Sequence, residues 1–169
     1  MPIVTTIEGR IAQVAIDRPE KRNTLSSELC KDLAREFLEL NDDTRVRSIV
    51  LCGHNNVFCA GLDIEEQLAE NTPIFNEFQK VIDALDALSK PVVAAVSGPA
   101  VSQGAAMLYH CDLVFAGEYA LFSMPGLALG QTPRYGVSLL AVKSGGYKLA
   151  AQKLLLSEPI SAAEAVAMG

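Results

Sequence analysis

Residues 92–104 read VVAAVSGPAVSQG, which predicts an apolar strand running into a loop that contains Gly98 and Gly104. An earlier stretch has the same form, because the run SIVLCG at 48–53 is followed by the loop VFCAGLD at 57–63. Each loop leads into a helix-like segment, and such a loop can direct backbone N–H groups at a carbonyl oxygen. Two of these units together predict an oxyanion hole, which stabilises the negative charge that forms in acyl-group chemistry.

The rest of the chain alternates strands with helices. Short apolar or alternating runs predict strands over 11–16, 48–53, 92–96, 113–116 and 120–122. Helical spacing and capping residues predict helices from Ser26, from Asp63, from Thr72-Pro73, over 104–111, after Pro133 with breaks at Gly145-Gly146 and Pro159, and from Ser161. This alternation predicts an α/β fold with a sheet rich in parallel strands.

Three helix starts have a predicted capping arrangement. Glu66 lies three residues after Asp63, and Glu164 lies three residues after Ser161, which is the spacing of a capping box. Thr72 is the expected cap of the third helix, with proline at its first helical position.

Composition excludes several classes of function. Half of the 169 residues are hydrophobic, so one domain with a sizeable core is expected. The net charge of −6 argues against a nucleic-acid partner, because phosphate binding needs clustered lysine and arginine. Four cysteines without C-x-x-C spacing and two histidines make a poor metal set, so we expect no metal.

The sequence predicts a cytoplasmic protein. Its first residues lack a basic segment followed by a long apolar run, so we expect no signal peptide. No apolar run has the length of a membrane span, so we expect no membrane partner. The four thiols are expected to be reduced and mostly buried.

Six ordered motifs resemble the crotonase (enoyl-CoA hydratase/isomerase) superfamily across the whole chain. They are IDRPEKRNTLS at 16–26, FCAGLD at 58–63, KPVVAAVSG at 90–98, CDLVFA at 111–116, LGQTP at 129–133 and LSEPISAAEA at 156–165. The resemblance implies a crotonase-like α/β spiral of repeated ββα units, with residues 1–169 as its core domain. It also implies an acyl-CoA thioester as ligand, with coenzyme A belonging to the substrate and no permanently bound cofactor. Residues 97–101 and 129–133 look most like the Δ3,Δ2-enoyl-CoA isomerase branch.

The resemblance also assigns an oxyanion hole and a coenzyme A site. The backbone N–H groups of Leu62 and Gln103 would stabilise the enolate. The carbonyl of Ala60, and the backbone near Asp63 and Ile64, would contact adenine.

A basic pair in the first loop is the candidate phosphate contact. Lys21 and Arg22 could reach the phosphates of coenzyme A, or they could form an ordinary solvated turn. Both readings stay open at this point.

The chain lacks the catalytic glutamates of the family that it resembles. Hydratases have glutamates where this chain has Ala106 and Gly126, and the isomerase branch has one where this chain has Arg134. Alanine and glycine cannot transfer protons. Arg134 could instead pair with a carboxylate on the acyl group while Tyr135 donates a proton, which would suit decarboxylation or thioester hydrolysis. Alternatively, Arg134 points to solvent and Tyr135 packs, and the protein is a non-catalytic acyl-CoA-binding or scaffold protein.

Two further expectations concern assembly and the remaining reactive side chains. Family members continue past Gly169 with a helical region used for trimerisation, so we expect a fragment or a lost tail, and a homo-oligomer (trimer or hexamer) for a full-length form. We interpret His110 as a helix residue with satisfied hydrogen bonds and Cys59 as a non-nucleophilic thiol.

Overall fold

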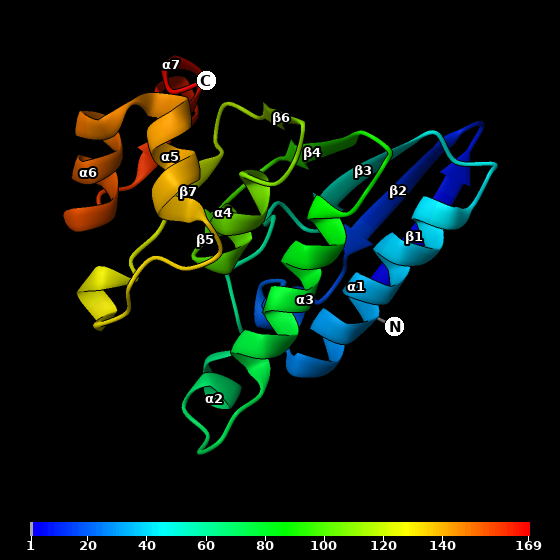
Figure 1. Cartoon of the computed structure of the whole chain (residues 1–169), viewed down its shortest axis with the longest axis horizontal. Helices are drawn as coiled ribbons and strands as arrows, with labels where there is room; N and C mark the ends of the chain where they lie inside the picture. Colours follow the sequence, from blue (N-terminus) through cyan, green and yellow to red (C-terminus); the bar gives the residue numbers. More distant parts are fainter. Residues whose placement is uncertain (1) are drawn as a thin grey trace.

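The computed structural model describes residues 2–169, and its larger sheet has five strands in the order β1-β2-β3-β4-β6 (Figure 1). Strand β1 (Ile3–Glu8) pairs antiparallel with β2 (Ile11–Ile16). Strands β3 (Ser48–Gly53), β4 (Val92–Val96) and β6 (Leu113–Ala116) then follow β2 in parallel. The predicted parallel-rich α/β sheet is therefore confirmed.

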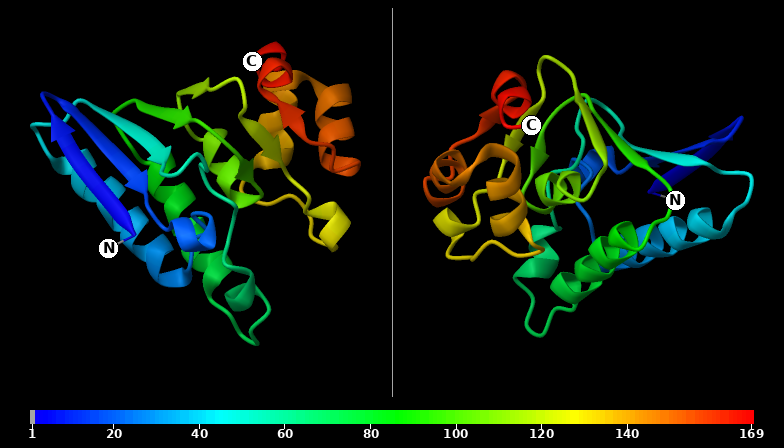
Figure 2. Two further views of the ribbon diagram at one scale, coloured as in Figure 1. Left: turned by 180° about the vertical axis from the view of Figure 1, so that it is seen from behind. Right: turned by 45° about the horizontal axis from the view of Figure 1, so that its top comes forward.

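Two helices cover one face of this sheet, as Figures 1 and 2 show. Helix α1 (Ser27–Asp42) and helix α3 (Ile74–Asp86) pack against each other. Their apolar residues recur at helical spacing, so each helix has one buried stripe. In α1 the stripe includes Leu29, Leu33, Phe37 and Leu40, which confirms the predicted helix face.

A second layer contains β5 (Ala100–Val101), α4 (Gln103–Leu108) and the part of the chain after β6 (Figure 2). Its sheet has the order β5, β7 (Leu121–Ser123) and β8 (Ile160–Ser161). The helices of this layer are α4, α5 (Val137–Gly145), α6 (Tyr147–Leu155) and α7 (Ala162–Ala167). Three short helices complete the chain: η1 (Pro19–Lys21), α2 (Ile64–Gln67) and η2 (Leu127–Leu129). Strands β5 and β8 were not predicted, since two residues carry no readable period.

The helix caps agree with the sequence at one predicted box and differ at the other. Ser161 and Glu164 form the capping box of α7. Asp63 caps α2 as predicted, but Glu66 does not close a box with it. The Glu66 carboxylate instead accepts hydrogen bonds from the N–H and hydroxyl of Ser27, because the start of α1 lies beside α2. At α3 the cap position is Pro73, one residue later than predicted.

Asn23 joins the ends of β2 and β3 through three hydrogen bonds. Its amide nitrogen donates to the carbonyls of His54 and Val57 at 3.0 and 2.7 Å, and its Oδ1 accepts from the N–H of Arg18 at 2.8 Å. The side chain is fully buried, and its φ of 57° lies in the left-handed region that asparagine tolerates. This contact fixes the loop that leads into the first glycine-bearing segment.

Candidate functional site

The two glycine-bearing loops lie side by side. Cys59 and Ala100 form an isolated parallel bridge, in which the Val101 N–H donates to the Cys59 carbonyl at 2.8 Å. Close backbone approach explains two of the glycines. A Cβ at Gly98 would lie 1.8 Å from the Asn56 carbonyl oxygen, and one at Gly104 would lie 2.3 Å from the Cys59 carbonyl oxygen. Any side chain at either position would push the loops apart.

Each loop presents one buried backbone N–H that has no acceptor in residues 2–169. These are the N–H groups of Leu62, which is 3% exposed, and Gln103, which is 6% exposed. The residues on both sides of Leu62 do pair, since Gly61 accepts from Leu25 and Asp63 donates to it. A buried N–H without a partner is costly, and such groups are rare in native proteins. Both N–H groups are therefore available to an acceptor on a ligand.

A hollow of about 50 Å³, open to solvent, adjoins Gln103. Its lining has no carboxylate and comes from α4 and the residue before it, the segment after β7, the start of α5 and the end of α6. The lining residues are Ser102, Gln103, Ala106, Met124, Gly126, Leu127, Gln131, Thr132, Pro133, Arg134, Tyr135, Val137 and Leu154. The fold thus places the three positions that depart from the catalytic pattern, Ala106, Gly126 and Arg134, around one hollow.

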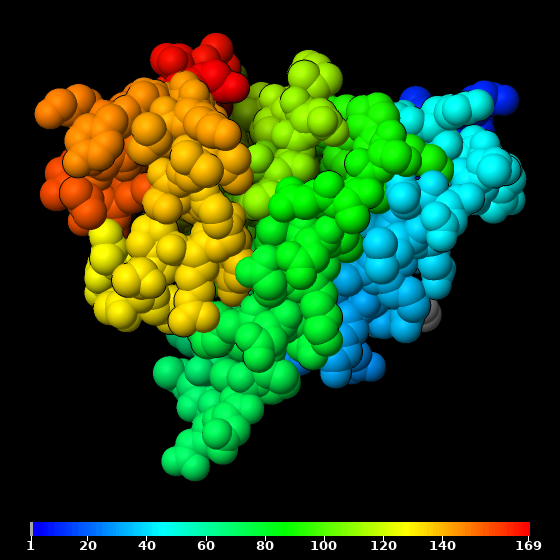
Figure 3. Space-filling model, viewed as in Figure 1, coloured from blue at the N-terminus to red at the C-terminus, as the bar shows by residue number. Residues whose placement is uncertain are grey.

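Arg134 and Tyr135 both contact helix α3. In Figure 3 the yellow to orange segment that contains them lies against the green atoms of α3. The Arg134 guanidinium stacks 4.8 Å from the ring centroid of Phe75. The Tyr135 ring lies 4.7 Å from that of Phe78 in an edge-on arrangement, and its hydroxyl donates to the Phe75 carbonyl at 3.4 Å. Burial raises the pKa of Tyr135 to about 12, although Arg134 opposes the shift.

This placement agrees with the packing alternative for Tyr135, and the role of Tyr135 as a proton donor stays a prediction.

His110 contacts the backbone of the same segment. Its ring nitrogens lie 2.7 Å from the Asp86 carboxylate and 2.9 Å from the Tyr135 carbonyl. Both ring nitrogens are paired as predicted, but His110 lies in the turn after α4 and not in a helix, because α4 ends at Leu108.

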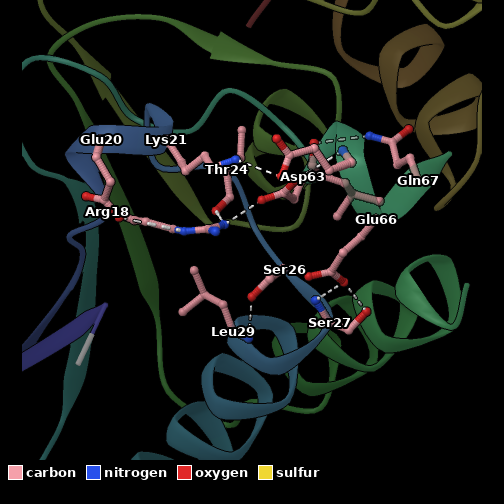
Figure 4. Close-up of polar contacts among 12 residues, drawn as sticks. Arg18, Glu20, Lys21, Thr24, Ser26, Ser27, Leu29, Asp63, Glu66 and Gln67 are labelled. Carbon is pink, nitrogen blue, oxygen red and sulfur yellow. Dashed lines mark hydrogen bonds and ion pairs between the residues drawn. The ribbon is translucent and has the colours of Figure 1, made fainter. Parts of the chain in front are cut away.

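Two of the residues expected to contact coenzyme A, Lys21 and Asp63, lie near α2 (Figure 4). Lys21 bonds the Glu65 carboxylate at 3.0 Å, and that hydrogen bond raises the pKa of Lys21. Arg22 ends η1 in a left-handed conformation. The Ala60 carbonyl accepts no hydrogen bond from residues 2–169, and Ile64 is 65% exposed. Both are open to a ligand.

Arg18 is a residue of this region that the sequence reasoning missed. Its guanidinium donates to the Asp63 carboxylate at 3.0 Å and to the Thr24 carbonyl at 3.2 Å (Figure 4). Asp63 is 4% exposed, and it also accepts from the N–H of Glu65 at 3.1 Å. Arg18 stands within the motif at 16–26, but neighbouring residues do not show that it pairs with Asp63, which lies 45 residues later.

Burial disfavours thiolate chemistry at the first loop. It raises the pKa of Cys59 to about 12, so the thiol stays protonated near neutral pH. Within residues 2–169, no cluster of three histidine, cysteine or acidic side chains could hold a metal ion. The described helices also include none long and apolar enough to cross a membrane.

Comparison with known proteins places these features in a family. The family model for enoyl-CoA hydratase/isomerase matches residues 6–169. The chain is 33% identical to a short-chain-enoyl-CoA hydratase of Clostridium acetobutylicum and 31% identical to a 2,3-dehydroadipyl-CoA hydratase of Escherichia coli, over 99% of its length in both cases. An enoyl-CoA hydratase/isomerase from Pseudoalteromonas atlantica superposes with a TM-score of 0.93 at 32% identity, over 100% of this chain and 67% of that one.

The chain spans 66% of the length of the two hydratases that it matches. The match extends across both sheets and both glycine-bearing loops, since it begins in β1 and runs to Gly169. The chain belongs to the enoyl-CoA hydratase/isomerase family and has the crotonase-like fold that its sequence motifs predict.

Proposed function

We propose that this protein binds an acyl-CoA thioester and polarises its carbonyl through the backbone N–H groups of Leu62 and Gln103. The observation that carries this proposal is the pair of buried, unpaired N–H groups on two loops that are bonded to each other. A thioester oxygen that gains charge as an enolate would receive both hydrogen bonds. Donors already fixed in position cost no reorganisation during reaction, so they favour the charged state over the neutral ester.

The surroundings suggest how the ligand lies. The coenzyme A part would extend over α2, where the Ala60 carbonyl, the backbone near Asp63, and Ile64 are the expected contacts, with Lys21 and Arg22 near the phosphates. The acyl part would enter the hollow beside α4. Coenzyme A belongs to the substrate in this proposal. A trimer or hexamer remains the proposed assembly for a full-length form.

A second candidate function is binding without catalysis. It is favoured by the lining of the hollow, where Ala106, Gly126 and Arg134 stand and no carboxylate is present. The resemblance puts the glutamates of hydratases and of the isomerase branch at these positions. Without them, hydration has no general acid or base. Chemistry on an acidic acyl-CoA, using Arg134 and Tyr135, is the catalytic alternative, and isomerisation would need another base.

Calorimetry with acetoacetyl-CoA beside free coenzyme A tests the main proposal. Acetoacetyl-CoA mimics the enolate, so the thioester should bind at least about tenfold more tightly than coenzyme A, which corresponds to about 1.4 kcal/mol. Equal binding would support a coenzyme A-binding protein without carbonyl polarisation. Binding of neither ligand would contradict the proposal.

Two changes at Arg134 separate the alternatives. If the protein acts on an acidic acyl-CoA, Arg134→Ala should abolish turnover of malonyl-CoA while coenzyme A still binds. If the isomerase branch is correct, Arg134→Glu should restore isomerisation of a 3-enoyl-CoA. If the wild type and both Arg134 variants bind acyl-CoA with the same affinity and none of them turns it over, the non-catalytic function is supported.

A further inference from the structure

The side chain of Gln103 carries an unpartnered donor at the hollow. Gln103 begins α4, is 6% exposed and lines the hollow. Its Oε1 accepts a hydrogen bond from the Ser102 hydroxyl at 2.7 Å. No group in residues 2–169 accepts a hydrogen bond from its Nε2. The residue lines the open hollow, so its amide nitrogen is free to donate to an acceptor on a ligand that enters there.

The structure pairs the oxygen end of the amide with Ser102. The Ser102 hydroxyl holds Oε1 at the loop, and Oε1 would lie 3.3 Å from a Cβ placed on Gly61. The two polar atoms of an amide lie on opposite sides of its carbon, so Nε2 is turned away from Gly61. Nε2 therefore lies on the side of the amide away from Gly61, and Gln103 is one of the residues that line the hollow.

The lining restricts the chemistry of the missing acceptor. Ala106, Met124, Val137 and Leu154 give the hollow apolar walls, and its one charged residue, Arg134, is exposed and stacked on Phe75. A carboxylate buried against a neutral amide would lack a counter-charge and would pay most of its desolvation cost. A hydroxyl or ketone oxygen carries no such cost and needs only one donor.

We infer that Gln103 determines acyl specificity by donating from Nε2 to an uncharged oxygen on the acyl chain. The residue thereby has two roles, since its backbone N–H serves the thioester and its side chain serves the acyl group. Ser102 is the positioning residue, because its hydroxyl holds the amide in the donating orientation. This inference rests on the proposed function, since it requires an acyl-CoA in the hollow.

Binding of four-carbon acyl-CoAs tests the inference by calorimetry. The probes are butyryl-CoA, 3-hydroxybutyryl-CoA, 4-hydroxybutyryl-CoA and succinyl-CoA, which differ only in the acceptor they carry. The wild type should bind one of the hydroxyacyl forms about fivefold more tightly than butyryl-CoA, as one added hydrogen bond predicts. Gln103→Ala should bring that ratio to about one.

Two further variants keep the test decisive if Gln103→Ala folds poorly. Gln103→Glu has the same shape and keeps the acceptor for Ser102, but it replaces the free donor by an acceptor, so the ratio should fall below one. Gln79→Ala removes an exposed glutamine of α3 that bonds Asp83, and it should keep the wild-type ratio.

The outcomes separate the inference from the function on which it rests. A ratio near one in the wild type, with tight binding of butyryl-CoA, would overturn the inference and leave the proposed function standing. A ratio that survives both Gln103 changes would do the same, as would a clear preference for succinyl-CoA, which would indicate Arg134 instead. Failure of the wild type to bind any of the four ligands would overturn both.

Discussion

At the scale of single residues, the candidate site is marked by strained backbone beside unpaired polar groups. Ser102 has φ 54° and ψ −117°, a conformation that glycine adopts readily and that other residues rarely populate. The resembled family usually has a run of glycines here, whereas this chain has Ser102 and Gln103. The fold therefore accepts strain at the residue whose hydroxyl orients the Gln103 amide.

Comparison of two substitutions at Ser102 measures this strain. Ser102→Gly should be more stable to urea than Ser102→Ala by about 1 kcal/mol, because both lose the hydroxyl and only glycine relieves the positive φ. The order should reverse at Ser144, which lies in α5 with ordinary helical backbone, since alanine is the better helix former there. Equal stability of the two Ser102 variants would contradict the interpretation of strain.

At the scale of elements, contacts between loops and helices hold the site together. The Arg18–Asp63 pair joins the loop after β2 to the start of α2, and Glu66 joins α2 to the start of α1. Asn23 and the Cys59–Ala100 bridge connect the same region to β3 and to the second loop. These contacts join segments far apart in the chain, so damage to one should loosen the loop that carries Leu62.

Removal of Arg18 should destabilise the protein markedly. Arg18→Met leaves the Asp63 carboxylate buried with the N–H of Glu65 as its remaining donor, and we expect a loss of about 3 kcal/mol in urea unfolding. The double variant Arg18→Met, Asp63→Asn should recover part of that loss, because no buried charge remains. A single-variant cost below about 1 kcal/mol would show that the pair behaves like an exposed salt bridge.

The C-terminal helix α7 should respond to acid through Glu164. Hydrogen bonds from Lys153 and from Ser161 lower its pKa from 4.5 to about 2. A carboxyl whose folded pKa is depressed contributes stability above pH 4.5, and that contribution is lost as the pH falls from 4.5 to about 2. Glu164→Gln should therefore show a shallower fall in thermal midpoint across this window than the wild type.

Glu118→Gln is the matched control, because Glu118 is exposed and forms no ion pair in residues 2–169. Its melting curve should follow the wild type at each pH. If the thermal midpoints of the wild type and Glu164→Gln fall equally as the pH is lowered, Glu164 is not the source of this acid sensitivity.

At the scale of the whole molecule, β6 forms an exposed edge of the larger sheet (Figure 1). All four of its residues are exposed, and Phe115 is 66% exposed. An apolar edge strand with unpaired backbone groups favours pairing with another chain. This edge is therefore our proposed contact for self-association.

Phe115→Glu should therefore weaken self-association. In sedimentation velocity, the wild type should show mass rising with concentration, and Phe115→Glu should stay closer to the monomer, since a charge on an edge strand opposes pairing. Leu38→Glu, at an exposed position on α1 away from this edge, should behave as the wild type. Equal association of all three proteins would exclude β6 as the contact.

Local sequence patterns predicted most of the helices and strands, but they predicted few of the hydrogen bonds and ion pairs at the site. The stripe of α1, the strand at 92–96 and the box at Ser161 are written in neighbouring residues, so they were readable in advance. The partner of Glu66 was not, because Ser27 lies 39 residues away. The roles expected of Leu62, Gln103, Arg134 and Tyr135 in binding or catalysis stay predictions.

The sequence by itself determined the family and the crotonase-like α/β fold, because ordered motifs and the periods of apolar residues are properties of the chain alone. Only the tertiary structure decided which polar groups remain unpaired. Whether the N–H of Leu62, or Nε2 of Gln103, has an acceptor depends on which distant backbone comes within hydrogen-bond distance. That approach is set by the packing of two sheets and their loops, and no run of neighbouring residues encodes it.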